Sequence, residues 1–138
     1  MVWGVGHSLL GEPFALTRKH FETPFGRFLC DTAFVEAAAA RLGEAAYRGE
    51  LAHRDEHSIE IQALYLRYAF PERPMTLVPI LCGGFHALLD QAGSPRESAE
   101  FEALVEAVRA TERDLGGDTL HVAAVDLSHV GARFGDSA

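Results

Sequence analysis

The chain has 138 residues, of which 48% are hydrophobic and 23% charged, as is usual for a globular protein with a packed core. This length fits a single domain covering residues 1–138. The formal net charge of -8 argues against a nucleic acid or an anionic membrane as the partner. No apolar run approaches the roughly 20 residues that a transmembrane helix needs. The two cysteines form no C-x-x-C pair, so we expect reduced thiols and a cytoplasmic protein.

Apolar runs alternate with helical patterns along the chain. The runs predict buried strands at residues 2–6, 76–81 and 120–125. Helix propensity, amphipathic spacing and turn residues predict helices at 33–47, 57–70 and 98–115. This alternation predicts an α/β layered fold, in which helices flank a central sheet that is largely parallel or mixed.

The segment between Leu9 and Cys30 follows no period for long. Pro13 and Pro24 make a continuous helix there unfavourable. The segment also contains several phenylalanines, which suggests that it packs against the domain. Ordered loops of this length are often functional.

The stretch from His53 to Gln62 is the densest in titratable groups. His53 and His57 are four residues apart, which in a helix would place them on one face. The spacing is similar to the H-E-x-x-H motif of zinc proteases, but Arg-Asp-Glu stands between the histidines, so no glutamate follows the first one. That order of residues excludes the zinc-protease interpretation and leaves the start of a helix rich in ionisable groups.

Three histidines stand at the ends of predicted elements: His7, His57 and His129. Two of them follow buried strands, and parallel strands end at a shared edge, so the three imidazoles could converge there. Histidines together with carboxylates suit a divalent metal such as iron, copper or zinc. A loop histidine taken alone is more often a surface or hydrogen-bonding group, and composition leaves both interpretations open.

Several short blocks resemble those of the Memo family, whose bacterial and archaeal members are often named AmmeMemoRadiSam system protein B. The matching blocks are Gly6-His7, Phe21-Glu22-Thr23-Pro24-Phe25-Gly26, Glu56-His57-Ser58-Ile59-Glu60, Leu77-Val78-Pro79-Ile80-Leu81 and Asp126-Leu127-Ser128-His129-Val130-Gly131. The resemblance implies a fold akin to that of the LigB-type class III extradiol dioxygenases, with a histidine-lined pocket at the sheet edge.

Two functions follow from the resemblance. The first is a metal-dependent oxidoreductase that uses non-haem iron or copper, with zinc less expected, and acts on a small molecule. The second is a non-catalytic module that binds a peptide or a small anion in the same pocket. A metal-assisted hydrolase is a third possibility, favoured only by a zinc ion with a bound water. The resemblance specifies neither the substrate nor the oligomeric state.

Carried over residue by residue, the resemblance implies that His7 and His129 are metal-site histidines. It implies that His57 is either the acid/base residue or a metal ligand. Ser128 stands where some members have a cysteine, and serine is a poor ligand for soft metals. An earlier family histidine, in an H-A-G block, is absent. The chain is therefore expected to be the middle of a longer protein, with its strand at 2–6 beside an unpaired edge. The incomplete ligand set makes a metal-free site the alternative.

The carboxylates near these histidines have two interpretations each. Asp55 or Glu56 could orient the ring of His57 for proton transfer, or both could only complement a helix amino terminus. Asp126 could pair with His129, or it could bond the backbone of its own turn. The other histidines, His20, His53, His86 and His121, are assigned no function.

Overall fold

The computed structural model describes residues 1–84, 93–126 and 129–135. Within these residues one sheet has the strand order β2-β3-β1-β4. Its strands are β1 (Val2–Val5), β2 (Phe14–Leu16), β3 (Pro79–Cys82) and β4 (Val122–Ala124). β1 runs parallel to β3 and to β4, whereas β2 runs antiparallel to β3. The mixed sheet with helices on its faces confirms the predicted α/β layered fold.

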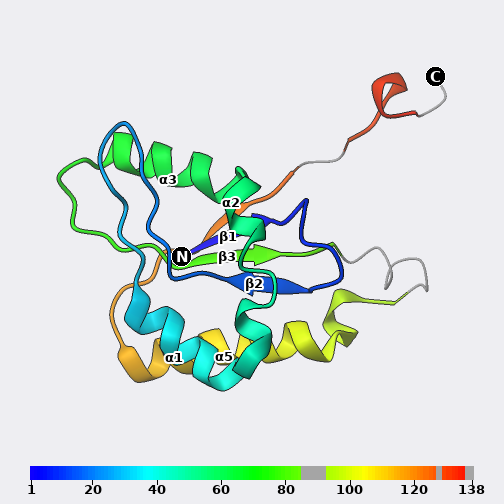
Figure 1. The fold of residues 1–138 in the computed structure, drawn as a ribbon, viewed down its shortest axis with the longest axis horizontal. Helices are drawn as coiled ribbons and strands as arrows, with labels where there is room; N and C mark the ends of the chain where they lie inside the picture. Colours follow the sequence, from blue (N-terminus) through cyan, green and yellow to red (C-terminus); the bar gives the residue numbers. More distant parts are fainter. Residues whose placement is uncertain (85–92, 127–128, 136–138) are drawn as a thin grey trace.

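Helices cover both faces of this sheet (Figure 1). α3 (Ser58–Ala69) lies on one face, and α1 (Thr32–Leu42) and α5 (Ala99–Leu115) lie together on the other. Shorter elements are η1 (Gly43–Tyr47), α2 (Ala52–Asp55), η2 (Pro95–Glu97) and η3 (Ala132–Phe134). Alternate strand residues enter two separate cores: Ile80 packs towards α1 and α5, and its neighbour Leu81 packs in the core that contains Ile59 of α3.

Two of the predicted helices are confirmed with small changes of their ends. α5 begins after the capping residue Ser98 and ends where Gly116 takes a φ of 66°. α3 ends before Pro71, as predicted. The helix predicted over 33–47 instead stops at Leu42, because Gly43 has a φ of 66°, and the tighter turn of η1 follows.

His53 and His57 do not share one helical face, although their spacing alone would allow it. α2 ends at Asp55, and Glu56 has extended backbone angles of φ -101° and ψ 133°. α3 begins only at Ser58. His53 and His57 therefore lie on two different helices, and Glu56 forms the corner between them.

The sequence did not predict β2, which is too short to show an alternating pattern. Phe14 of this strand and Phe28 are each 2% exposed, so the phenylalanine-rich segment does pack against the domain. Phe25 is an exception, since it is exposed, and its ring contacts that of the exposed Tyr68.

The strand at residues 2–6 does not border an unpaired edge, contrary to the expectation. β1 is paired on both sides, with β3 and with β4. β4 and β2 are the edge strands of the described sheet instead, and Ala123 within β4 is exposed, so β4 is not the fully buried strand predicted. Pro79 is tolerated because it is the first residue of β3.

Two further findings concern the cysteines and the helices. Cys30 and Cys82 are both free thiols rather than a disulfide. Among the described residues, no helix combines the length and the apolar character needed to cross a membrane.

Candidate functional site

His7 and Asp126 are brought together by the parallel pairing of β1 and β4. Each residue follows the carboxyl end of its strand, and the two strands are neighbours in the sheet. Parallel strands end at the same edge, which is where open α/β sheets place ligand sites. His7 and Asp126 therefore lie close together because each follows an apolar run that forms one of two neighbouring parallel strands.

A close contact between α3 and β1 places Glu56 and His57 at the same edge. Gly4 has no side chain, and a Cβ added there would lie 2.5 Å from Ser58 Oγ and 2.6 Å from Ile59 Cγ1. The Ser58 hydroxyl donates a hydrogen bond to the Val5 carbonyl at 2.9 Å. Because glycine permits this approach, the first turn of α3 sits directly beside the end of β1.

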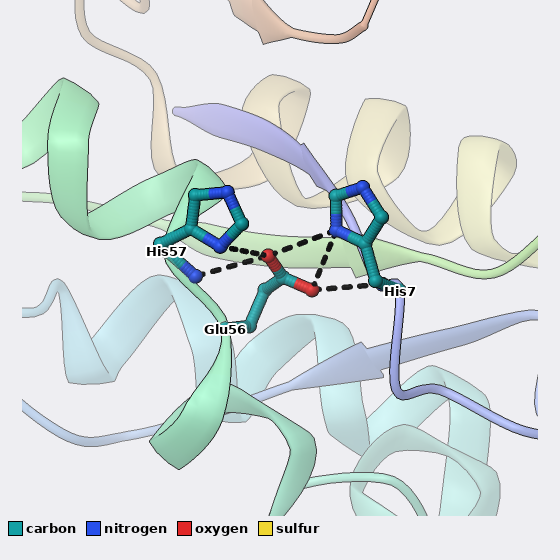
Figure 2. Close-up of side chains that lie close together, drawn as sticks. All are labelled: His7, Glu56 and His57. Atoms are coloured by element: carbon teal, nitrogen blue, oxygen red, sulfur yellow. Dashed lines mark hydrogen bonds and ion pairs between the residues drawn. The ribbon is translucent and has the colours of Figure 1, made fainter. Parts of the chain in front are cut away.

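Glu56 lies between His7 and His57 at the centre of the site (Figure 2), and only 2% of its side chain is exposed. Its carboxylate accepts backbone hydrogen bonds from His7 N at 2.7 Å, His57 N at 2.9 Å and Ser58 N at 3.2 Å. Burial alone would raise the pKa of Glu56, but these bonds and the His7 ring outweigh it and lower that pKa. Glu56 is thus an ionised residue that ties the end of β1 to the α2–α3 corner.

The ring of His7 lies between two carboxylates. Its Nδ1 is 3.1 Å from both oxygens of Glu56, and its Nε2 is 3.1 Å from Asp126 Oδ2. The hydrogen bonds with Asp126 and then with Glu56 raise the pKa of His7. A neutral imidazole has only one N–H, so it would turn a lone pair towards one of the two carboxylates. A proton or a metal cation between His7 Nε2 and Asp126 removes this conflict.

Two more histidines complete the group. The His57 ring is stacked on the His7 ring, with centroids 5.5 Å apart and planes 8° apart, and its Nδ1 is 3.3 Å from Glu56 Oε1. His129 Nε2 is 4.0 Å from Asp126 Oδ2, and its ring stacks on Phe134. We call His7, Glu56, His57, Asp126 and His129 the histidine cluster.

The cluster contains most of the residues singled out in the sequence. The structure stacks His57 on His7, whereas His129 reaches this group only through Asp126, and it makes Glu56 rather than Asp55 the carboxylate that contacts His57. Asp55 is 80% exposed and pairs only loosely with Arg54, at 3.9 Å. Ser128 lies outside the described residues, as does His86.

Sequence reasoning missed three features of the site. It did not predict that Glu56 holds His7, because that contact joins residues 49 apart and depends on the extended corner at Glu56. It also overlooked Gly4 and Ser58. A glycine inside an apolar strand was the one available signal, since such a residue often marks a close approach of two segments.

The cluster can offer several atoms to a metal. Ligand atoms of His7, Glu56 and His57 lie within 4.8 Å of one another. The oxygens of Glu56 already accept three backbone N–H groups, so this carboxylate is better suited to orient His7 than to bind a metal itself. The atoms more available to a cation are His7 Nε2, the Asp126 carboxylate and the rings of His57 and His129.

A cleft of about 510 Å³ adjoins the cluster. It was expected to be lined by His7, His57 and His129, but the histidines on its wall are His20 and His53. His7 and His57 instead lie on the open surface, with 47% and 66% of their side chains exposed. Glu56 borders both the cleft and the cluster.

The position of His7 predicts a pH dependence of stability. Its pKa is raised above 6.5 in the folded state, so its contribution is complete below about pH 6.5 and is lost as the pH rises through the folded pKa. Replacing His7 by glutamine should therefore destabilise the protein more at about pH 5.5 than at about pH 8. Urea denaturation of both proteins at the two pH values measures this. An equal or larger loss at the higher pH would contradict the ion pairing of His7.

These features define an α/β layered protein with a histidine–carboxylate cluster at the ends of parallel strands. The family of Memo-like proteins matches residues 1–138, and the chain belongs to this family. It is 39% identical over 134 residues to a MEMO1 family protein of Thermus thermophilus, which covers 97% of this chain and 35% of that protein. It is 31% identical over 138 residues to a MEMO1 family protein of Pyrococcus furiosus, covering 98% of this chain and 43% of the relative.

The chain thus spans less than half the length of these two relatives. Comparison with solved structures gives no significant match.

Proposed function

We propose that the histidine cluster contributes to a metal site for non-haem iron or copper in an oxidoreductase that acts on a small molecule. The observation that carries this proposal is the position of His7 between Glu56 and Asp126, with each ring nitrogen 3.1 Å from a carboxylate oxygen. A histidine held by a carboxylate on one nitrogen presents its other nitrogen to a metal in a fixed orientation. Membership of the Memo-like family is compatible with this proposal and does not specify the reaction.

The residues present fit such a metal. His7, His57 and Glu56, whose ligand atoms lie within 4.8 Å of one another, give two imidazoles and one carboxylate, a donor set that suits non-haem iron(II). Asp126, 3.1 Å from His7 Nε2, is a second carboxylate that would be available to the metal. Imidazole also suits copper, but Ser128 offers no thiolate at the position next to His129. Iron is therefore the metal that we favour.

In this proposal Glu56 and His57 have different roles. A bound iron or copper supplies one-electron and oxygen chemistry, which protein side chains do not provide themselves. Glu56 fixes one proton of His7 on Nδ1, so a metal would be held through Nε2, which faces Asp126. His57, stacked on His7 and 66% exposed, can accept or donate a proton at its ring for a substrate that approaches from solvent.

A second candidate is a metal-free module that binds a peptide or a small anion. The exposure of His7 and His57 favours it, because both rings are open to a large partner. The two functions require different protonation states of His7, because a protonated ring attracts an anion whereas a metal displaces the proton.

Metal titration of the Asp126→Asn variant distinguishes them. Wild-type protein, stripped of metal and free of any tag, should bind iron(II) under anaerobic conditions, or copper(II), at close to one ion per chain. Asp126→Asn should weaken this binding at least about tenfold, because an amide oxygen replaces a charged ligand. Asp118→Asn makes the same change at an exposed position after α5 and should leave the affinity unchanged.

Absence of near-stoichiometric metal in the wild type, or equal binding by both variants, would contradict the metal site. Binding of inorganic phosphate by the metal-free protein, lost in His57→Ala, would instead support the second candidate.

A further inference from the structure

The helix α3 has apolar residues on both of its faces. Ile59 and Ala63 are buried against the sheet. On the opposite face, Ile61, Tyr65 and Tyr68 are exposed by 43%, 61% and 64%. A surface helix usually carries charged or polar residues on its outer face, whereas a helix that is apolar all round is usually covered on all sides. The sequence of α3 is therefore that of a helix with a partner on each face.

The outer residues of α3 form one continuous row. They are separated by four and then three residues, which places their side chains next to one another along one side of the helix. Phe25 is also exposed and extends the row, because its ring contacts that of Tyr68 with the centroids 5.0 Å apart. We call Phe25, Ile61, Tyr65 and Tyr68 the outer stripe. Within the described residues, no other helix or strand covers α3 on the side away from the sheet (Figure 1).

The exposed area of the outer stripe is close to what a dimer interface requires. A large apolar side chain carries roughly 200 Å² of surface, so the exposed parts of these four residues amount to roughly 400 Å². A standard protein interface buries roughly 800 Å² from each partner. A little over half of that area is apolar, and tyrosine and phenylalanine are enriched in it. The outer stripe can therefore supply most of the apolar area of such an interface.

The two ends of α3 carry opposite charges. Glu60 is exposed in the first turn, and Arg67 is half-buried in the last turn. The two residues are seven positions apart, which is about two helical turns, so they lie on the same side of the helix. The guanidinium of Arg67 lies over the ring of Phe28, and within the part of the chain that the structure describes neither charge forms an ion pair.

An antiparallel pair of α3 helices uses the stripe and the charges together. With a twofold axis next to Tyr65, Ile61 of each copy faces Tyr68 of the other, so a smaller side chain meets a larger one. The Glu60 end of each helix then lies beside the Arg67 end of the other, and the two helix dipoles oppose each other. A parallel pair would instead bring like charges together.

We propose that the outer stripe is a self-association surface, through which two copies of this chain form a symmetric dimer with antiparallel α3 helices. A twofold interface uses the same patch on both copies, so the patch must be complementary to itself. The outer stripe meets this requirement in side-chain size and in the charges at its ends. The proposal does not rest on the metal site, since no residue of the outer stripe belongs to the histidine cluster.

Sedimentation velocity over a series of protein concentrations tests the dimer. The wild type, free of metal and tag, should show a reversible equilibrium between monomer and dimer. Tyr65→Glu brings two negative charges together near the twofold axis and should raise the dissociation constant at least about thirtyfold, as the loss of an interface hot spot does. Leu10→Glu makes the same change of charge at an exposed apolar residue outside α3 and should leave the dissociation constant unchanged. Thermal unfolding verifies that both variants fold, which their exposure leads us to expect.

Disulfide cross-linking tests the antiparallel arrangement. When Ile61→Cys and Tyr68→Cys chains of different tag length are mixed and oxidised, the disulfide should form mainly between unlike chains. The wild type, with its two native free thiols, is the blank.

Three results would overturn the proposal. The first is a monomer at every concentration, which would leave the outer stripe to a segment of a longer polypeptide. The second is an equal effect of Tyr65→Glu and Leu10→Glu, and the third is a preference for disulfides between like chains. None of them depends on the metal site, because Asp126→Asn should dimerise as the wild type does.

Discussion

Replacing Glu56 by alanine is expected to lower the free energy of unfolding by about 3 kcal/mol, because several charge-assisted hydrogen bonds are lost together. The carboxylate accepts the backbone N–H groups of His7, His57 and Ser58 within 3.2 Å, and it is almost fully buried. Alanine leaves these donors without a partner and releases the end of β1 from the α2–α3 corner. Urea denaturation at neutral pH measures the change.

Two variants give this prediction its controls. Glu56→Gln keeps one carbonyl oxygen as an acceptor and should cost about half as much as the alanine variant. Glu60→Ala removes the same type of side chain one turn later, at an exposed position, and should change stability by less than about 0.5 kcal/mol. Equal effects of Glu56→Ala and Glu60→Ala would show that the buried carboxylate does not hold the two segments together.

Gly4→Ala is expected to cost about 2 kcal/mol, the usual size of an overpacking effect. The added methyl group would lie 2.5 Å from Ser58 Oγ and 2.6 Å from Ile59 Cγ1, so α3 must move away from β1. That movement also separates Glu56 from His7, since both depend on this contact. Thermal and urea denaturation measure the loss.

A double-mutant cycle identifies the contact responsible. Ile59→Ala removes one of the two clashing groups, so Gly4→Ala should cost less in the Ile59→Ala background than in the wild type. Strict additivity of the two substitutions would mean that the helix does not press on the strand at Gly4.

Much of the fold was predictable, because it depends on local patterns. Apolar runs locate β1, β3 and β4, and amphipathic spacing with the Ser98 cap locates α5. β2 was not predictable, since three residues cannot show a period and the strand owes its existence to its pairing with β3. The place of β1 in the interior of the sheet likewise depends on a pairing between distant segments.

The same distinction between local patterns and long-range contacts applies to the site. His7 and Asp126 end neighbouring parallel strands, so their proximity follows from the order of elements once the sheet is parallel there. The contact of Glu56 with His7 does not follow, because no sequence pattern marks the extended corner at Glu56 between α2 and α3. The cleft could not be predicted from the sequence either, since it forms only when residues 17–22 pack opposite residues 50–60.

The most direct test of the metal site is the protonation of the His7 ring, observed by nitrogen-15 NMR with zinc as a diamagnetic probe. Glu56 should hold a proton on Nδ1 both without and with the metal, and only the signal of Nε2 should move on addition of zinc. The ring of His20, whose Nδ1 accepts the Cys30 N–H, should remain unchanged. Zinc that leaves both nitrogens of His7 unaltered, or that displaces the proton from Nδ1, would contradict the proposed role of Glu56 and His7.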